Sequence, residues 1–298
     1  MDWQTVLLAT TSSLGVSLAG AWWLSQTLVQ HRLSRAMEAY KAELKQDADL
    51  ALGERAAQRQ YEYDARKRLY TAIGPLRFQL LLACREWAGR VQAHGSREQT
   101  YRMSLAGYYG RSTLYRLLRP LALAELIERE IAYFDFTVDA AAMDCLRFKK
   151  AATRMLSGDE VLGDHPGIDW SRQAQHAYTD SLAACAAALI VADSRGERVM
   201  RFHEFQALMD DPARVQTLDP FPALLGDFEL RSKPLLWARL VGYGHACQRF
   251  VDGAGQPLGF ETQAFPTERL LQASGDATLL ERCSSYVQRI ETTVQRRL

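Results

Sequence analysis

An arginine- and tyrosine-rich stretch, residues 76–120, contains the side chains best suited to binding a ligand. It holds eight arginines against two glutamates, a local charge of +6, and four tyrosines are spread among the arginines. Arginine presents a planar fork of donors that matches phosphate, and tyrosine rings can stack on bases. This composition predicts a nucleotide or oligonucleotide site, with Arg102, Tyr109, Arg111 and Arg116 as the candidate ligand-binding residues.

Two other interpretations of the same stretch stay open. The next segment, residues 121–139, holds five carboxylates against one arginine, a local charge of −4. The two stretches would then form ion pairs across adjacent helices, which is the usual fate of charged runs. Alternatively, the arginines would contact anionic lipid headgroups.

Catalytic motifs are absent from the sequence. It contains no G-x-x-x-x-G-K-[ST], no H-E-x-x-H and no G-x-S-x-G. His176 and Asp180 are four residues apart, a spacing that on a helix indicates a local hydrogen bond rather than an acid–base pair. The carboxylates of residues 157–169 lack the ordered spacing of a calcium loop. We therefore expect no enzyme activity, no catalytic residue, no metal site and no cofactor.

The five cysteines are scattered and include no C-x-x-C pair; they are Cys84, Cys145, Cys185, Cys247 and Cys283. Each falls in a run with helical character. An odd, unpaired set of this kind predicts buried thiols rather than a disulfide framework or a zinc site.

The elements that must position these residues begin with an uncharged stretch, Trp3–Val29. A helix of this length, at about 1.5 Å per residue, covers roughly 40 Å and would cross a ~30 Å hydrocarbon core. Basic residues follow it, beginning with Arg32 and Arg35, and positive charge favours the cytoplasmic side. The sequence predicts a single-pass protein of the bacterial inner membrane, with its N-terminus outside, its C-terminal domain cytoplasmic and the lipid bilayer as a partner.

Small residues recur every four positions in that stretch, at Ala9, Ser13, Ser17, Ala21 and Ser25, and Thr10 flanks them. The candidate pore or oligomer stripe is Thr10, Ser13, Ser17, Ala21 and Ser25. Small residues at this spacing let helices approach closely, and their hydroxyls can bond between helices. The stripe is compatible with a simple anchor, with a self-associating span, or with the weakly polar lining of a small pore.

Residues 31–74 predict a charged helical stalk. Leu33, Met37, Tyr40 and Leu44 have the 4-3-4 spacing of a short coiled coil, which favours a homo-oligomer. Gly74–Pro75 is expected to kink or end this helix. The predicted domains are therefore 1–30, the transmembrane helix; 31–74, the stalk; and 75–298, a cytosolic helical domain.

The fold class is predicted as all-α, with an N-terminal transmembrane helix, a stalk and a cytosolic α-helical domain. Expected helices are Leu76–Gln92, Arg97–Leu118, Leu121–Tyr133, Asp139–Leu156, Ser171–Val191, Glu197–Met209, Phe221–Glu229, Pro234–Val251, Pro266–Gln272 and Asp276–Arg297. Pro120, Pro234 and Pro266 suit first-turn positions. Strand signals are nearly absent, and Phe134–Val138 is the one short candidate.

Two segments, Ser112–Ala122 and Leu126–Glu130, are followed by an aspartate-bearing turn near Asp135. Together they resemble a pattern in bacterial single-span proteins. The organisation is similar to membrane effectors of anti-phage defence operons, such as the Hailong-type effector, which pairs with a nucleotidyltransferase. The resemblance implies an oligomeric channel that is opened by an oligonucleotide signal and that has a nucleotidyltransferase partner.

The leading functional hypothesis is thus an oligomeric membrane effector of bacterial anti-phage defence. It would form a channel or pore and be gated through its cytosolic domain by a nucleotide or oligonucleotide. The alternative is a membrane-tethered helical interaction scaffold without conductance. A third hypothesis is a tethered nucleic-acid binder, whose affinity would fall with salt.

Overall fold

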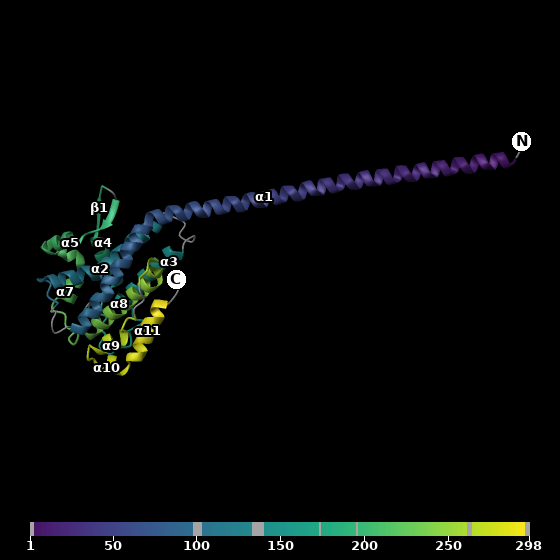
Figure 1. Ribbon diagram of the computed structural model, residues 1–298. Helices are drawn as coiled ribbons and strands as arrows, with labels where there is room; N and C mark the ends of the chain where they lie inside the picture. Colours follow the sequence, from purple (N-terminus) through teal and green to yellow (C-terminus); the bar gives the residue numbers. More distant parts are fainter. Residues whose placement is uncertain are drawn as a thin grey trace. The chain divides into compact units, whose positions relative to one another are not determined.

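The computed structural model describes the backbone of residues 3–97, 103–132, 140–172, 174–194, 196–260 and 264–295. Side chains are described from residue 20 onward within these ranges, except at 140 and 257. The chain divides into two compact units, Met1–Asp64 (unit 1) and Ala65–Leu298 (unit 2). Helix α1, Trp3–Arg97, contributes to both units (Figure 1).

Unit 2 is built mainly from helices, with one two-stranded hairpin among the described elements (Figure 1). After α1 its elements are α2 Tyr108–Ile131, α3 Ala140–Ser157, α4 Thr179–Ala188, β1 Ile190–Asp193, β2 Gly196–Val199, α5 Phe202–Met209, α6 Pro212–Val215, η2 Gln216–Leu218, α7 Phe221–Leu225, α8 Pro234–Gly255, η3 Gln256–Leu258, α9 Thr267–Gln272, α10 Ala277–Glu281 and α11 Cys283–Gln295.

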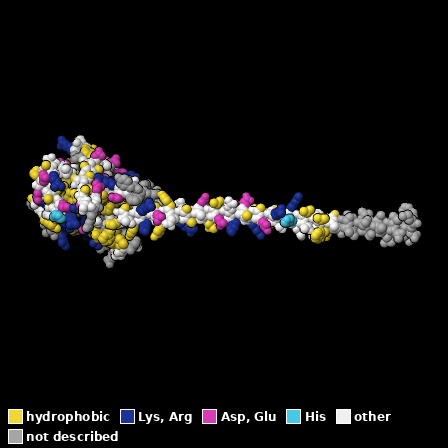
Figure 2. All heavy atoms as spheres, turned by 90° about the horizontal axis from the view of Figure 1, so that it is seen from above, with side chains coloured by type: hydrophobic (Ala, Val, Ile, Leu, Met, Phe, Trp, Pro, Cys, Tyr) yellow, Lys and Arg dark blue, Asp and Glu magenta, His cyan; other side chains and the backbone are white. Residues whose placement is uncertain are grey.

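Unit 1 consists of helix α1 without internal tertiary packing. Every side chain from residue 20 to residue 61 is exposed. Lys/Arg and Asp/Glu side chains of both signs, with hydrophobic ones between them, are distributed along this helix (Figure 2). The segment is rich in Ala, Leu, Glu, Gln, Lys and Arg, which are good helix formers. Local bonds add support, such as those from Gln58 to Glu62 and from Gln60 to Asp64, both 3.0 Å.

The predicted transmembrane helix is wrong for the described residues, and so are the fold class that includes it and the membrane localisation. The mainly helical character is confirmed. In the part of the chain that the structure describes, no helix combines the length and the apolar character that crossing a bilayer requires. His31, Arg32 and Arg35 follow the uncharged stretch on the same helix.

The predicted pore stripe is only partly described. The side chains of Thr10, Ser13 and Ser17 lie outside the described residues, whereas Ala21 and Ser25 are exposed on α1. A channel lining presupposes a spanning helix. The channel hypothesis itself stays a prediction.

The core of unit 2 forms where α1 becomes buried. Leu69, Ile73, Leu80 and Trp87 are at most 2% exposed, and their spacing of 4, 7 and 7 places them on one face of the helix. The central partner is α8, which is buried on nearly all sides. The rings of Trp87 and Tyr243 lie 5.6 Å apart between the two helices. All five cysteines are buried and free, as the sequence predicted.

Two prolines lie inside helices: Pro75, where the sequence predicts a kink or an end of the helix, and Pro120, for which it predicts a first-turn position. Helix α1 continues through Pro75, and α2 continues through Pro120. An interior proline costs a helix about 3 kcal/mol. Burial of neighbouring side chains such as Ile73 and Leu80 offsets that cost near Pro75. Pro234 lies in the first turn of α8, which confirms the prediction at that position.

An antiparallel hairpin replaces the ends of two predicted helices. Helix α4 covers only Thr179–Ala188, and β1 then pairs with β2 so that Ile190 lies opposite Val199. Gly196 has a φ of +116°. A residue with a side chain would be strained in this conformation, so glycine suits the tight connection. β-branched Ile and Val favour the extended backbone locally. The strand candidate Phe134–Val138 lies outside the described residues.

Candidate functional site

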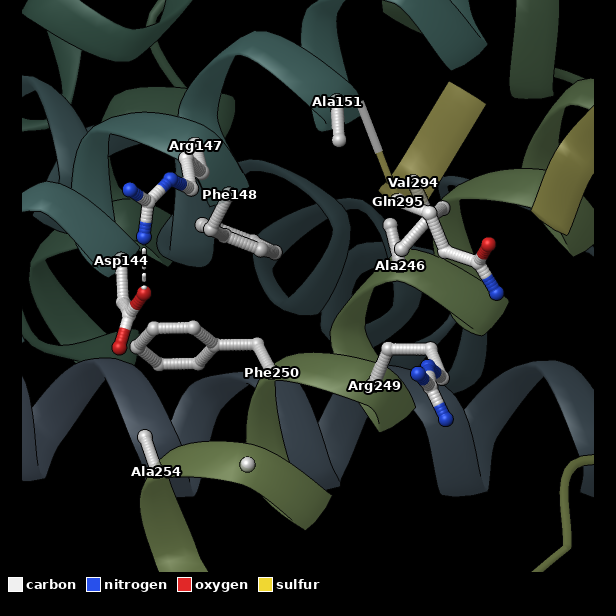
Figure 3. Close-up of a pocket in the computed structure, with 11 residues that line it drawn as sticks. Asp144, Arg147, Phe148, Ala151, Ala246, Arg249, Phe250, Ala254, Val294 and Gln295 are labelled. Atoms are coloured by element: carbon white, nitrogen blue, oxygen red, sulfur yellow. Dashed lines mark hydrogen bonds and ion pairs between the residues drawn. The ribbon is translucent and has the colours of Figure 1, made fainter. Parts of the chain in front are cut away.

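A pocket in unit 2 opens between α3, α8 and α11, and it holds a cavity of about 210 Å³ (Figure 3). Its lining combines two phenylalanines, two arginines, one carboxylate and several small residues. The lining residues are Asp144, Arg147, Phe148, Ala151, Ala246, Arg249, Phe250, Gly253, Ala254, Val294 and Gln295.

The sequence places the two sides of this pocket by helical periodicity. On α3, Asp144, Arg147, Phe148 and Ala151 are spaced by 3, 1 and 3 residues. The α8 residues, from Ala246 to Ala254, follow the same i, i+3, i+4 pattern. Residues at these spacings share one helix face. Because α3 packs on α8, the two faces meet and enclose the pocket.

One wall of the pocket is aromatic. Phe148 and Phe250 are mostly buried, and their ring centroids lie 5.1 Å apart at an interplanar angle of 41°. Such an arrangement is typical of favourable aromatic packing. The small side chains of Ala151, Ala246 and Ala254 leave the space beside the rings (Figure 3).

The polar side of the pocket carries excess positive charge. The Nη1 of Arg147 donates to the Oδ1 of Asp144 at 2.7 Å, and Figure 3 shows this pair on the side of the pocket opposite Arg249. The Nε of Arg147 is buried and has no hydrogen-bond partner among the described residues. Arg249 is exposed, and no described carboxylate lies within ion-pairing distance of it. Two cations against one anion leave a local charge of +1.

The predicted ligand residues lie elsewhere, on and before α2. Arg102 lies outside the described residues. Tyr109 packs under the guanidinium of Arg90, whose central carbon is 4.4 Å from the ring centroid. The hydroxyl of Tyr109 lies 3.1 Å from the Nδ1 of His94. Tyr109 thus contacts the buried side of α1 and does not line the pocket.

The arginines of the same set have partners within unit 2. Arg111 forms an ion pair with Asp210 at 2.6 Å, and its Nε donates to the carbonyl oxygen of Leu105 at 2.8 Å. Arg116 lies 3.8 Å from the carboxylate of Glu86. The structure therefore brings neither arginine to the pocket.

The described carboxylates of the acidic stretch, residues 121–139, do not pair with the arginines of residues 76–120 as the sequence suggested. Glu125 accepts hydrogen bonds from Arg129 at 3.1 Å and from Lys149 at 2.6 Å, and Lys149 also contacts Glu128. Burial alone would raise the pKa of Glu125, but the bonds from Lys149 and Arg129 outweigh burial and lower it. These contacts join α2 to α3.

His94 is a buried titratable group near the Arg90–Tyr109 pair. It is 2% exposed, and burial, followed by the charge of Arg90, lowers its pKa to about 4. Its Nε2 has no partner among the described residues. Aromatic rings surround it, with Phe228 and Trp237 within 6 Å of its ring. Its imidazole is therefore neutral at pH 7 and packs as part of the core.

The local hydrogen bond predicted for His176 and Asp180 requires both residues on one helix, but α4 begins at Thr179, after His176. His176 is buried against the rings of Trp170 and Tyr178, at centroid distances of 4.9 and 5.1 Å. Asp180 is exposed in the first turn of α4. Burial, followed by the charge of Arg239, lowers the pKa of His176.

Arg239, a buried cation near His176, has a structural role. Its Nη1 donates to the carbonyl oxygens of Met155 and Gly158, at 3.1 and 2.8 Å, at the C-terminal end of α3. Cations stabilise the negative end of a helix and satisfy its free carbonyls. Burial nevertheless lowers the pKa of Arg239 to about 10.

The acidic loop of residues 157–169 forms ion pairs and a helix cap. Asp164 contacts Arg282 and Arg289, and the bonds from Arg289 lower the pKa of Asp164 to about 2. His165 accepts the N–H of Gly167 on Nδ1, so its Nε2 donates to Asp276, which caps α10. Within the described ranges, no three His, Cys, Asp or Glu side chains are grouped closely enough to hold a metal ion.

Sequence reasoning missed the α3–α8 pocket, although a signal for it exists. The dipeptide Arg-Phe occurs at residues 77–78, 147–148, 201–202 and 249–250, and the second and fourth of these lie on helical stripes that include small residues. Each stripe alone is indistinguishable from an ordinary core face. Only the packing of α3 on α8 brings the two dipeptides to one cavity.

Comparison of the chain with protein-family models, curated proteins and solved structures gave no significant match. The resemblance to anti-phage defence effectors, with its nucleotidyltransferase partner, therefore stays a prediction.

Proposed function

We propose that this protein is a homo-oligomeric helical scaffold, in which α1 of unit 1 pairs with the same segment of a second copy and unit 2 serves as a binding domain. The observation that carries the proposal is an exposed apolar seam. Leu33, Met37, Tyr40 and Leu44 are 63, 50, 59 and 51% exposed, and they follow a coiled-coil spacing.

An unpaired helix of this kind is a weak structure by itself. Most helical stability in proteins comes from packing of an apolar face, and isolated helices in water are marginal. The side chains of residues 20–60 are exposed in the structure. Burial of the seam would remove apolar area from water at about 25 cal/mol per Å².

A second copy is the occupant that the seam fits best. Two identical helices present seams of the same length and spacing, which is what a self-complementary interface requires. The side chains that flank the seam carry both signs, with Lys41 on one side and Glu43 on the other. Two copies therefore do not face each other with charges of a single sign, which would oppose pairing.

Sedimentation equilibrium of the full chain over a range of concentrations tests the proposal. We expect a mass that is a multiple of 33.6 kDa. The double variant Met37→Glu/Leu44→Glu places charges on the seam and should shift the mass toward the monomer.

The matched control is Ala39→Glu/Ala42→Glu, which adds the same charge to the same helix away from the seam. It should keep the oligomer. A wild-type chain that is monomeric at every concentration overturns the proposal, and so do two double variants that dissociate equally.

A further inference from the structure

We infer that the α3–α8–α11 pocket binds a small aromatic anion, a carboxylate or a phosphate monoester attached to a single ring. The inference rests on the cavity, its charge and its aromatic wall, and it does not depend on self-association of α1. No residue of the predicted arginine–tyrosine site takes part in it.

The size of the cavity limits the ligand. Pockets for drug-sized molecules measure about 300–1,000 Å³, whereas this cavity measures about 210 Å³. That volume matches one ring with an acidic substituent and is too small for an oligonucleotide. The mouth is bordered by Gly253, where an added Cβ would meet no atom within 4 Å.

The charges around the cavity select an anion. Arg249 has no carboxylate partner among the described residues, and the single carboxylate of the lining, Asp144, already accepts from Arg147. The buried Nε of Arg147 lacks an acceptor among those residues. Arg249, which is exposed, is therefore the arginine that an oxygen atom of a ligand can reach directly. Guanidinium groups match carboxylate and phosphate in geometry.

The aromatic wall selects the rest of the ligand. Phe148 and Phe250 present ring faces and edges next to the alanines, and aromatic pairs prefer offset or edge-to-face packing. A ligand ring that packs on this pair removes its own apolar surface and that of the wall from water. An inorganic anion has no such surface, so we expect it to bind more weakly.

The test is calorimetric titration of the full chain with phenyl phosphate and benzoate, with inorganic phosphate and benzylamine as comparison probes. We expect both aromatic anions to bind at least tenfold more tightly than either comparison probe. Equal binding of benzylamine overturns the assignment of an anion site, and absence of binding by both aromatic anions at millimolar concentration overturns the site itself.

Variants locate the binding. Arg249→Gln should weaken phenyl phosphate at least tenfold, whereas the charge-matched control Arg172→Gln should leave it unchanged, because Arg172 is 82% exposed and does not line the pocket. Equal effects of these two variants would mean nonspecific attraction and would overturn the site.

A second variant separates binding from folding. Gly253→Leu adds a side chain at the mouth without a clash at Cβ, so it should block the ligand and leave the melting temperature unchanged. Full binding by this variant overturns the location. The seam variant Met37→Glu/Leu44→Glu should still bind phenyl phosphate, so failure of the self-association proposal and failure of this one can be told apart.

Discussion

Helix α1 offers a comparison within a single element, because its two parts differ in burial but not in secondary structure. In unit 1, Leu44 and Leu52 are 51 and 56% exposed. In unit 2, Leu69 and Leu80 of the same helix are 0% exposed. Both parts are rich in helix-forming residues, so propensity does not distinguish them. The difference lies in whether a second element covers the apolar face.

One helix can thus combine a part that is stabilised by tertiary packing with a part that is stabilised by local interactions. The unit 2 part is held by the shared core with α8, as in the contact of Trp87 with Tyr243. The unit 1 part carries local bonds such as that from Gln60 to Asp64. Local pairs contribute a few tenths of a kcal/mol each, whereas burial of one large side chain contributes about 1.5–3 kcal/mol.

The largest expected difference comes from the same substitution in each part. Leu80→Ala leaves a cavity in a filled core and should lower the free energy of unfolding by about 2–5 kcal/mol. Leu44→Ala should change the unfolding of unit 2 by less than about 0.5 kcal/mol. Urea denaturation followed by tryptophan fluorescence measures both, since Trp87 and Trp237 are buried in unit 2. Equal losses would contradict the contrast.

A pH titration of stability should depend on His94. Its pKa is about 4 in the folded chain, against an ordinary 6.5, so the unfolded chain binds a proton that the folded chain does not. Stability from this group is complete above pH 6.5, falls between pH 6.5 and 4, and changes no further below pH 4; the loss is about 3 kcal/mol.

The variants His94→Asn and His31→Asn assign this pH dependence. His94→Asn should flatten the profile, although not fully, because burial lowers the pKa of His176 and His245 as well. His31→Asn, on the exposed part of α1, should keep the wild-type profile. Identical profiles for the wild type and His94→Asn would exclude the assigned role.

Arg239→Met should lower the free energy of unfolding by about 1–3 kcal/mol, because the carbonyls of Met155 and Gly158 lose their donor at the end of α3. Arg35→Met, on the exposed part of α1, is the matched substitution and should have no measurable effect on the unfolding of unit 2. Thermal denaturation compares them. An unchanged Arg239→Met would refute the capping role.

The smallest effect is expected from glycine replacement, and it should differ in sign between the units. In Gly53→Ala the added Cβ meets no atom within 4 Å. The substitution should raise helicity and stabilise the helix by about 0.5–1 kcal/mol. Gly110→Ala would place Cβ 2.2 Å from the carbonyl oxygen of Ser104, so it should lower the free energy of unfolding of unit 2 by about 1 kcal/mol or more. Circular dichroism during heating measures both, and a shared sign would contradict the comparison.

Residue types alone did not locate the pocket between α3, α8 and α11. A cluster of arginines and tyrosines was a sound reason to expect a ligand, yet Arg111 binds Asp210 and Arg116 lies beside Glu86. Charge counts along a sequence do not reveal which carboxylate approaches from a distant segment. Conversely, nothing in the sequence distinguishes Arg249 from other surface cations. Its position in the lining of the cavity makes it a candidate ligand-binding residue.

Local spacing and composition are enough to predict the mainly helical character, the burial of the five thiols and the first-turn position of Pro234. Tertiary structure decided what local patterns cannot express. It carried α1 through Pro75, turned residues 190–199 into a hairpin, and brought the faces of α3 and α8 together. Non-local burial decides these features, since burial of several side chains outweighs the cost of one unfavourable local conformation.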